Sequence, residues 1–130
     1  MYLFTLVDHI RRLIEDLRHE RGEYMLVMLY NQTLDAETSW NLIVSSDWTD
    51  TLGVGDATKF LAEKLFEYLG PDQRAGVSRI TVLKTTDAFV KDMTRLYQVN
   101  GTGFPLQQVT AGGVNEGSGF VLYSRPEVTA

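Results

Sequence analysis

The sequence predicts an α/β (α+β) domain in which helices pack on a mixed β-sheet. Three observations support this fold class. Apolar residues repeat at helical spacing in three segments, short apolar runs of strand length lie between and after them, and the elements follow the order α-β-β-α-β-α-β-β. Helices placed between strands favour a mixed sheet with helices on it. The length of 130 residues suits one domain, residues 1–130, and neither an internal repeat nor a linker divides it.

The first helix is predicted from an apolar stripe with spacings of four and three residues, formed by Leu3, Val7, Ile10, Ile14 and Leu17. Such spacing is typical of an amphipathic helix. Arg21 and Gly22 end it. The stripe is expected to pack on the sheet, and it is also a possible surface for a protein partner or for self-association.

Two strands and a bend follow. Residues 23–30 form a short, uninterrupted apolar run, as expected of a buried strand, and residues 40–46 form a second one. The polar stretch 31–38 between them is predicted to be a bend. Residues 47–55 are predicted to be a loop, because Gly53 and Gly55 relax the backbone.

The next elements are predicted from caps and breakers. Asp56 is a suitable N-cap for a helix, and Gly70 followed by Pro71 is a suitable stop. Residues 77–83 predict the third strand, and Thr86 with Asp87 caps a short helix. The apolar positions of the two helices are Phe60, Leu61, Leu65, Tyr68 and Leu69, and then Phe89, Val90, Met93, Leu96 and Tyr97.

The last third of the chain is rich in glycine. Residues 104–109 and 120–124 predict two strands around the loop 110–119, and residues 125–130 predict a frayed tail. The glycines of the loop suit a mobile lid, but a long hairpin loop without function is commoner.

Composition limits the possible partners and the compartment. The net charge of −5 and the scattered basic residues argue against nucleic acid and against an anionic membrane surface. The absence of cysteine removes disulfides, thiolate zinc sites and cysteine nucleophiles. Neither a signal peptide nor a membrane helix is predicted. A cytoplasmic location is therefore expected.

Five stretches follow one frame, at residues 26–31, 39–47, 80–82, 86–89 and 119–123. They correspond to the first strand, the second strand with its exit, the third strand, a helix start and a closing strand. This order resembles the minimal nucleotidyltransferase domains over most of the chain. In that family the first strand ends in Gly-Ser, Asp-x-Asp opens the second strand, and the third strand carries another Asp. The resemblance implies a nucleotidyltransferase-like fold, and such domains often pair with a helical partner protein.

The residues that carry the family's chemistry are replaced here. Tyr30 and Asn31 stand in place of Gly-Ser, Ser39 and Asn41 in place of the two Asp, and Thr81 near the third. Magnesium in phosphoryl-type transfer is held by carboxylates and substrate phosphates, and a hydroxyl and an amide supply no such charge. These five residues are predicted to form a vestigial site or ligand cleft, with no catalytic residue, no metal and no cofactor.

Carboxylates elsewhere are an alternative. Asp35 and Glu37 share strand parity with Ser39 and Asn41, and Asp47 and Asp50 follow the second strand. Only with such displaced carboxylates are magnesium and nucleotide expected. The apolar run after Asn41 fixes the register against this, and solvated bend residues are the simpler interpretation.

Other motifs favour structural roles. His9 and His19 lie ten residues apart on one helix, about 15 Å along its axis, so they do not form one site. Gly53 and Gly55 are interpreted as turn residues rather than an anion cradle, because Asp56 is negative. Trp40 and Trp48 share a face. They form either a surface for a partner or a core ring beside a partly exposed one.

The leading hypothesis is a non-catalytic, nucleotidyltransferase-like module that binds a ligand or a protein. One alternative is a small α/β adaptor or structural subunit unrelated to nucleotidyltransferases. The other is an active enzyme with displaced carboxylates.

Overall fold

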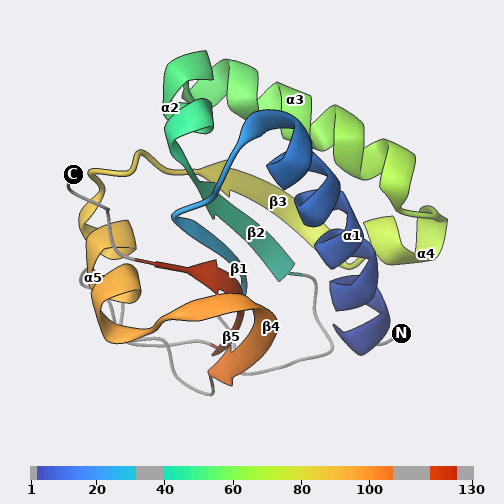
Figure 1. The fold of residues 1–130 in the computed structure, drawn as a ribbon. Coiled ribbons are helices and arrows are strands. Elements are labelled where there is room, and N and C mark those ends of the chain that lie inside the picture. The colour runs from blue at the N-terminus through green and yellow to red at the C-terminus, as the bar shows by residue number, and fades with distance from the viewer. Residues whose placement is uncertain (1–2, 32–39, 107–117, 126–130) are drawn as a thin grey trace.

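The computed structural model describes residues 3–31, 40–106 and 118–125, which form a mixed sheet with helices on both faces (Figure 1). The elements are α1 (Leu3–Arg21), β1 (Leu26–Asn31), β2 (Trp40–Ser45), α2 (Asp47–Leu52), α3 (Val54–Tyr68), α4 (Pro71–Arg74), β3 (Val77–Val82), α5 (Ala88–Leu96), β4 (Val99–Leu106) and β5 (Ser118–Ser124). The described strands follow the order β3-β2-β1-β5-β4. Only β2 and β3 are parallel among the described pairs. The predicted mixed sheet is confirmed.

Two apolar layers hold the helices to the sheet. On one face, α1 and α3 pack over Val27, Leu29, Leu42 and Val44. On the other face, α5 packs over a smaller cluster that includes Met28 and Ile43. The alternation of buried side chains along β1 and β2 therefore supplies both layers.

The apolar stripe of α1 belongs to the core of its own chain. Val7, Ile10, Ile14 and Leu17 are each at most 2% exposed. The side chain of Leu3 lies outside the described ones. The prediction that this stripe serves a protein partner or self-association is wrong for its four described members, because the sheet and α3 already cover them. Among the described residues no helix is long and apolar enough to cross a membrane.

The predicted loop 47–55 is instead largely helical. Ser46 begins α2 as a capping box: its side chain accepts from the Thr49 backbone N–H, and the Thr49 hydroxyl oxygen accepts from the Ser46 N–H. A capping box normally carries Glu or Gln at the second position, so Thr49 concealed the signal. The N-cap predicted at Asp56 is also wrong, because α3 begins at Val54 after Gly53, whose φ is 92°. Asp56 lies in the first turn, where a negative charge is favourable.

Several predicted boundaries are confirmed. The first helix ends at Arg21, and the side chain of Asp87 accepts from the Phe89 N–H as the N-cap of α5. The third helix ends at Tyr68, and Pro71 begins the short α4 rather than only stopping a helix. Proline suits a first helical position because its missing N–H has no partner there anyway.

The glycine-rich third of the chain differs most from expectation. The strand predicted at 104–109 is β4, which begins at Val99. Gly101 and Gly103 have φ of 84° and 88°, and the pairing of β4 with β5 shifts between Asn100 and Phe104. Such an irregularity needs residues that tolerate positive φ. Ser118 and Gly119 belong to β5. Residues 107–117 and 126–130 lie outside the described residues.

Candidate functional site

Three of the five predicted site residues lie together on the sheet. Tyr30 on β1 is paired with Asn41 on β2, and the Thr81 hydroxyl on β3 donates to Asn41 Oδ1 over 3.0 Å. Tyr30 packs against the cluster on the α5 side of the sheet. Asn41 shares that face because it precedes Ile43 by two residues. The three form a polar row across adjacent strands.

The other two predicted residues do not join this row. Asn31 is 4% exposed, and it follows Tyr30 on a strand, so its side chain lies on the opposite face. Ser39 lies outside the described residues, as do Asp35 and Glu37 of the displaced-carboxylate alternative.

The polar row is neutral and internally hydrogen-bonded. Among the described residues, no group of three or more His, Cys, Asp or Glu side chains is placed to hold a metal ion. Asp50 has a structural role. Its carboxylate accepts hydrogen bonds from the Thr85 N–H and, over 2.6 Å, from the Thr85 hydroxyl. These bonds tie α2 to the segment after β3. Asp47 is exposed at the start of α2.

The two tryptophans pack inward to different degrees. Trp40 is 4% exposed and part of the core on the α1 side, which makes a partner surface at its ring incompatible with the fold. Trp48 is half-buried and meets Tyr24 and Phe60 edge-on, with ring centroids 5.9 and 6.0 Å away. A core ring beside a partly exposed one, the second interpretation above, describes the pair.

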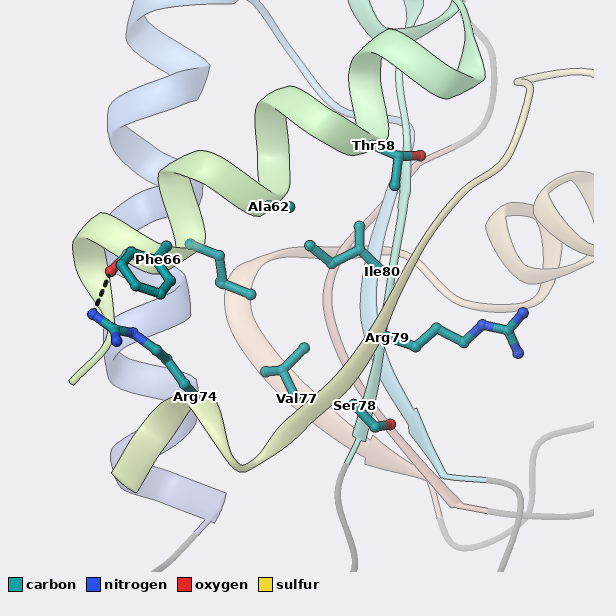
Figure 2. Close-up of a pocket in the computed structure, with 9 residues that line it drawn as sticks. Thr58, Ala62, Phe66, Arg74, Val77, Ser78, Arg79 and Ile80 are labelled. Carbon is teal, nitrogen blue, oxygen red and sulfur yellow. Dashed lines mark hydrogen bonds between the residues drawn. The ribbon is translucent and has the colours of Figure 1, made fainter. Parts of the chain in front are cut away.

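An apolar groove with a volume of about 330 Å³ lies between α3 and β3 (Figure 2). Its walls carry Ala62, Leu65 and Phe66 from α3, and Val77 and Ile80 from β3. Thr58, Ser78, Arg74 and Arg79 complete the lining. No acidic side chain among the described residues lines it. The groove can therefore accept apolar side chains whose neighbours are neutral or negative.

Phe66 is an exposed ring held in place at the rim of this groove. It is 63% exposed, and the Arg74 guanidinium lies 3.6 Å from its ring centroid. Arg74 also donates to the carbonyl oxygen of Leu69 over 2.9 Å. It donates to the carbonyl oxygen of Phe66 over 2.9 Å as well, as the dashed line in Figure 2 shows. These bonds fix Arg74 against the end of α3, where carbonyl groups lack helical partners. The aromatic rim is thus oriented before anything binds.

The groove runs along an edge of the described sheet. Strand β3 is the end strand, with β2 as its only neighbour among the described strands. The Leu83 N–H donates to the carbonyl oxygen of Val44 on β2 over 3.0 Å. Because backbone groups alternate in direction along a strand, Thr81 and Leu83 face β2, and Ile80 and Val82 direct their N–H and C=O groups away from it.

A second cavity, of about 440 Å³, is polar. It lies between α1 and the β4–β5 end of the sheet, and it is lined by Arg18, Glu23, Gln98, Val99, Asn100, Tyr123, Ser124 and Arg125. Arg18 is bound to Glu23 over 2.7 Å and to Glu15 over 3.2 Å, and Arg125 donates to the Tyr24 carbonyl over 2.9 Å. The two arginines of this cavity are therefore already bound to groups of the same chain.

Sequence reasoning did not find the groove. Phe66 was the available signal, because it lies in α3 but outside the predicted apolar face of that helix. The position of β3 at the end of the described sheet depends on the strand order, which no local pattern in the sequence indicates. Comparisons add no family to this geometry, because no family model, curated protein or solved structure matches the chain.

Proposed function

We propose that this domain is a non-catalytic protein-interaction module, built on a nucleotidyltransferase-like frame, that binds a polypeptide in the groove between α3 and β3. The apolar groove along the edge strand is the observation that carries the proposal. An apolar opening next to backbone groups that pair with no other described strand offers both contacts that an extended polypeptide needs.

The size and chemistry of the groove support this role. Its volume of about 330 Å³ lies at the lower end of the range for ligand sites. Aromatic and arginine side chains are enriched at protein interfaces, and Phe66 with Arg74 supplies one of each. A large ring left 63% exposed and held by two hydrogen bonds on its neighbour is a preformed anchor point for a partner.

The non-catalytic part of the proposal rests on the polar row. In the resembling family, carboxylates at the positions of Asn41 and Thr81 would hold magnesium. Here a hydroxyl donates to an amide oxygen over 3.0 Å, so the two groups satisfy each other and carry no charge. The replacement of metal-binding carboxylates by a neutral, hydrogen-bonded pair supports a domain that binds a partner rather than one that transfers a phosphoryl group.

Panning a random peptide library against the folded domain tests the interaction role. The wild-type chain should enrich apolar sequences, and Ala62→Arg should abolish the enrichment because a long side chain fills the groove. Ala88→Arg is the matched control, since Ala88 is an exposed residue of α5 on the other face of the sheet. Enrichment that survives Ala62→Arg contradicts the groove as the binding surface.

Titration calorimetry with ATP and GTP, with and without magnesium, tests the non-catalytic role. We expect no magnesium-dependent binding tighter than about 100 μM, equivalent to about 5.5 kcal/mol. Tighter magnesium-dependent binding would instead favour the enzyme with displaced carboxylates, and Glu37→Gln and Asp47→Asn would then show whether those two groups hold the metal.

A further inference from the structure

We propose that the polypeptide in the groove adds to the sheet as a new strand beside β3, and that its sequence alternates aliphatic and acidic residues. This inference rests on the proposed function and specifies it, because it names the backbone conformation and the chemistry of the partner. Four features of β3 lead to it: its position, its backbone, its two faces and its charge.

The backbone of β3 offers a template for another strand. Ile80 is partly exposed and directs its N–H and C=O groups away from β2, and β3 ends the described sheet. Val82 directs its groups the same way but is only 5% exposed, so the accessible part of this edge centres on Ile80. No hydrogen bond from another described element reaches those groups. An unpaired edge readily accepts an extended chain. The six residues of β3 match a segment of about five to seven residues.

The two faces of β3 differ in chemistry, and this sets the alternation. Val77 and Ile80 point into the groove toward α3, whereas Arg79 points away from α3 on the other side of the strand (Figure 2). Alternate side chains of an added strand would follow the same two directions. One set enters the groove beside Phe66, and the other lies beside Arg79.

Charge selects acidic residues for the second set. Arg79 is exposed and forms no ion pair with any described residue. Arg74 lies with Phe66 on the groove side, so the positive charge beside the second set is that of Arg79. Opposite charges on adjacent strands are favourable and like charges are not. The edge of a second copy would bring another Arg79 to a basic rim, which argues against self-pairing.

The charge argument is tested with two fluorescent seven-residue peptides, one alternating valine with glutamate and one alternating valine with lysine. Anisotropy titrations at low salt should show the glutamate peptide binding at least about fivefold more tightly. Arg79→Glu should reverse the preference. Arg12→Glu is the control, because Arg12 is an exposed arginine on α1 and the variant makes the same change of charge away from β3. It should preserve the preference for the glutamate peptide. Equal affinities for the two peptides in the wild-type chain would overturn the acidic specificity.

The strand geometry is tested by methylating peptide nitrogens. In an added strand, alternate N–H groups face β3 and the others face solvent. Methylation of one alternate set of the glutamate peptide should therefore weaken binding more than tenfold, and methylation of the other set should change it little. Equal effects of the two sets would overturn strand addition.

These tests separate the inference from the proposed function. If both peptides bind equally, and Ala62→Arg abolishes binding, the groove is an interaction site without the specificity inferred here. If neither peptide nor any library sequence binds, the proposed function itself fails. A peptide affinity that falls as protein concentration rises would show that a second copy occupies the edge, and it would overturn the inference.

Discussion

At the scale of single residues, Arg74 organises the groove through three contacts. Its side chain stacks on Phe66 and bonds to two carbonyl groups near the end of α3. A lysine would keep the charge but lose the planar stack and the paired donors. The position of the Phe66 ring therefore depends on the planar guanidinium of Arg74. Neither the charge of Arg74 nor its position in the sequence predicts these contacts.

Two glycines are expected to respond oppositely to alanine. A Cβ atom at Gly103 would lie 2.5 Å from the Phe120 ring, and φ there is 88°. Gly103→Ala should therefore lower the free energy of unfolding by about 2 kcal/mol or more. Gly55 lies in α3, and a Cβ there meets nothing within 4 Å. Gly55→Ala should raise the free energy of unfolding by about 0.4–1 kcal/mol. Urea denaturation measures both, and equal effects would contradict the account.

Tyr24 should give the domain a pH-dependent stability in alkali. Its side chain is 1% exposed and donates to the Ile14 carbonyl over 3.1 Å. Burial raises the pKa of the Tyr24 hydroxyl far above its usual range. The unfolded chain, with a tyrosine pKa of about 10, then loses this proton first. The stabilising contribution is complete below about pH 10 and is lost as pH rises above it.

The comparison variant is Tyr24→Phe, which lacks this ionisation. Between about pH 10 and 11, the free energy of unfolding of the wild type should fall more steeply than that of Tyr24→Phe, by up to about 1.4 kcal/mol per pH unit. At pH 7 the variant should lose about 1 kcal/mol, because one hydrogen bond is missing. Parallel pH profiles for the two proteins would show that the buried hydroxyl does not ionise in this way.

At the scale of elements, α2 depends on its N-terminal cap. Ser46 and Thr49 are both 0% exposed and bond to each other and to each other's backbone. Ser46→Ala should cost about 1–2 kcal/mol of unfolding free energy, because it leaves the buried Thr49 N–H without its acceptor. Thr51→Ala is the control: its exposed hydroxyl donates only within α2, so about 0.5 kcal/mol or less is expected. A difference below experimental error between the two variants would contradict this role for the cap.

The elements also show what sequence patterns reveal. Long periodic or uninterrupted apolar runs predicted α1, β1, β2 and β3 to within a few residues, because burial on a face determines spacing. The short α2 was missed, since its cap uses Thr49 rather than an acidic side chain. The start of β4 was missed because Gly101 and Gly103 interrupt the apolar pattern while forming an irregular pairing with β5.

At the scale of the whole molecule, the α1 stripe is core and not interface. Ile14 is 0% exposed, so Ile14→Ala should cost about 2–5 kcal/mol through lost burial and a cavity. The melting temperature of the wild type should not change over a hundredfold range of protein concentration, because its core closes within one chain. A melting temperature that rises with concentration would indicate that a second copy completes the fold.

The candidate site itself is a property of the whole fold. The sequence predicted Tyr30, Asn41 and Thr81 as site residues, and the pairing of β1, β2 and β3 places these three side by side. Each of the three was singled out only by its place in the frame that resembles the minimal nucleotidyltransferase domains. No such signal pointed to the groove: Phe66 and Ile80 line it together only because β3, the end strand of the described sheet, runs alongside α3.

Backbone hydrogen exchange at Ile80 tests the docking of a strand on β3 most directly. In the free chain its N–H faces away from β2, so it should exchange quickly, whereas the Thr81 N–H faces β2 and should already be protected. At saturation with the valine–glutamate peptide, exchange at Ile80 should slow at least about tenfold and exchange at Thr81 should change little. Unchanged exchange at Ile80 with the peptide bound would contradict strand addition at this edge.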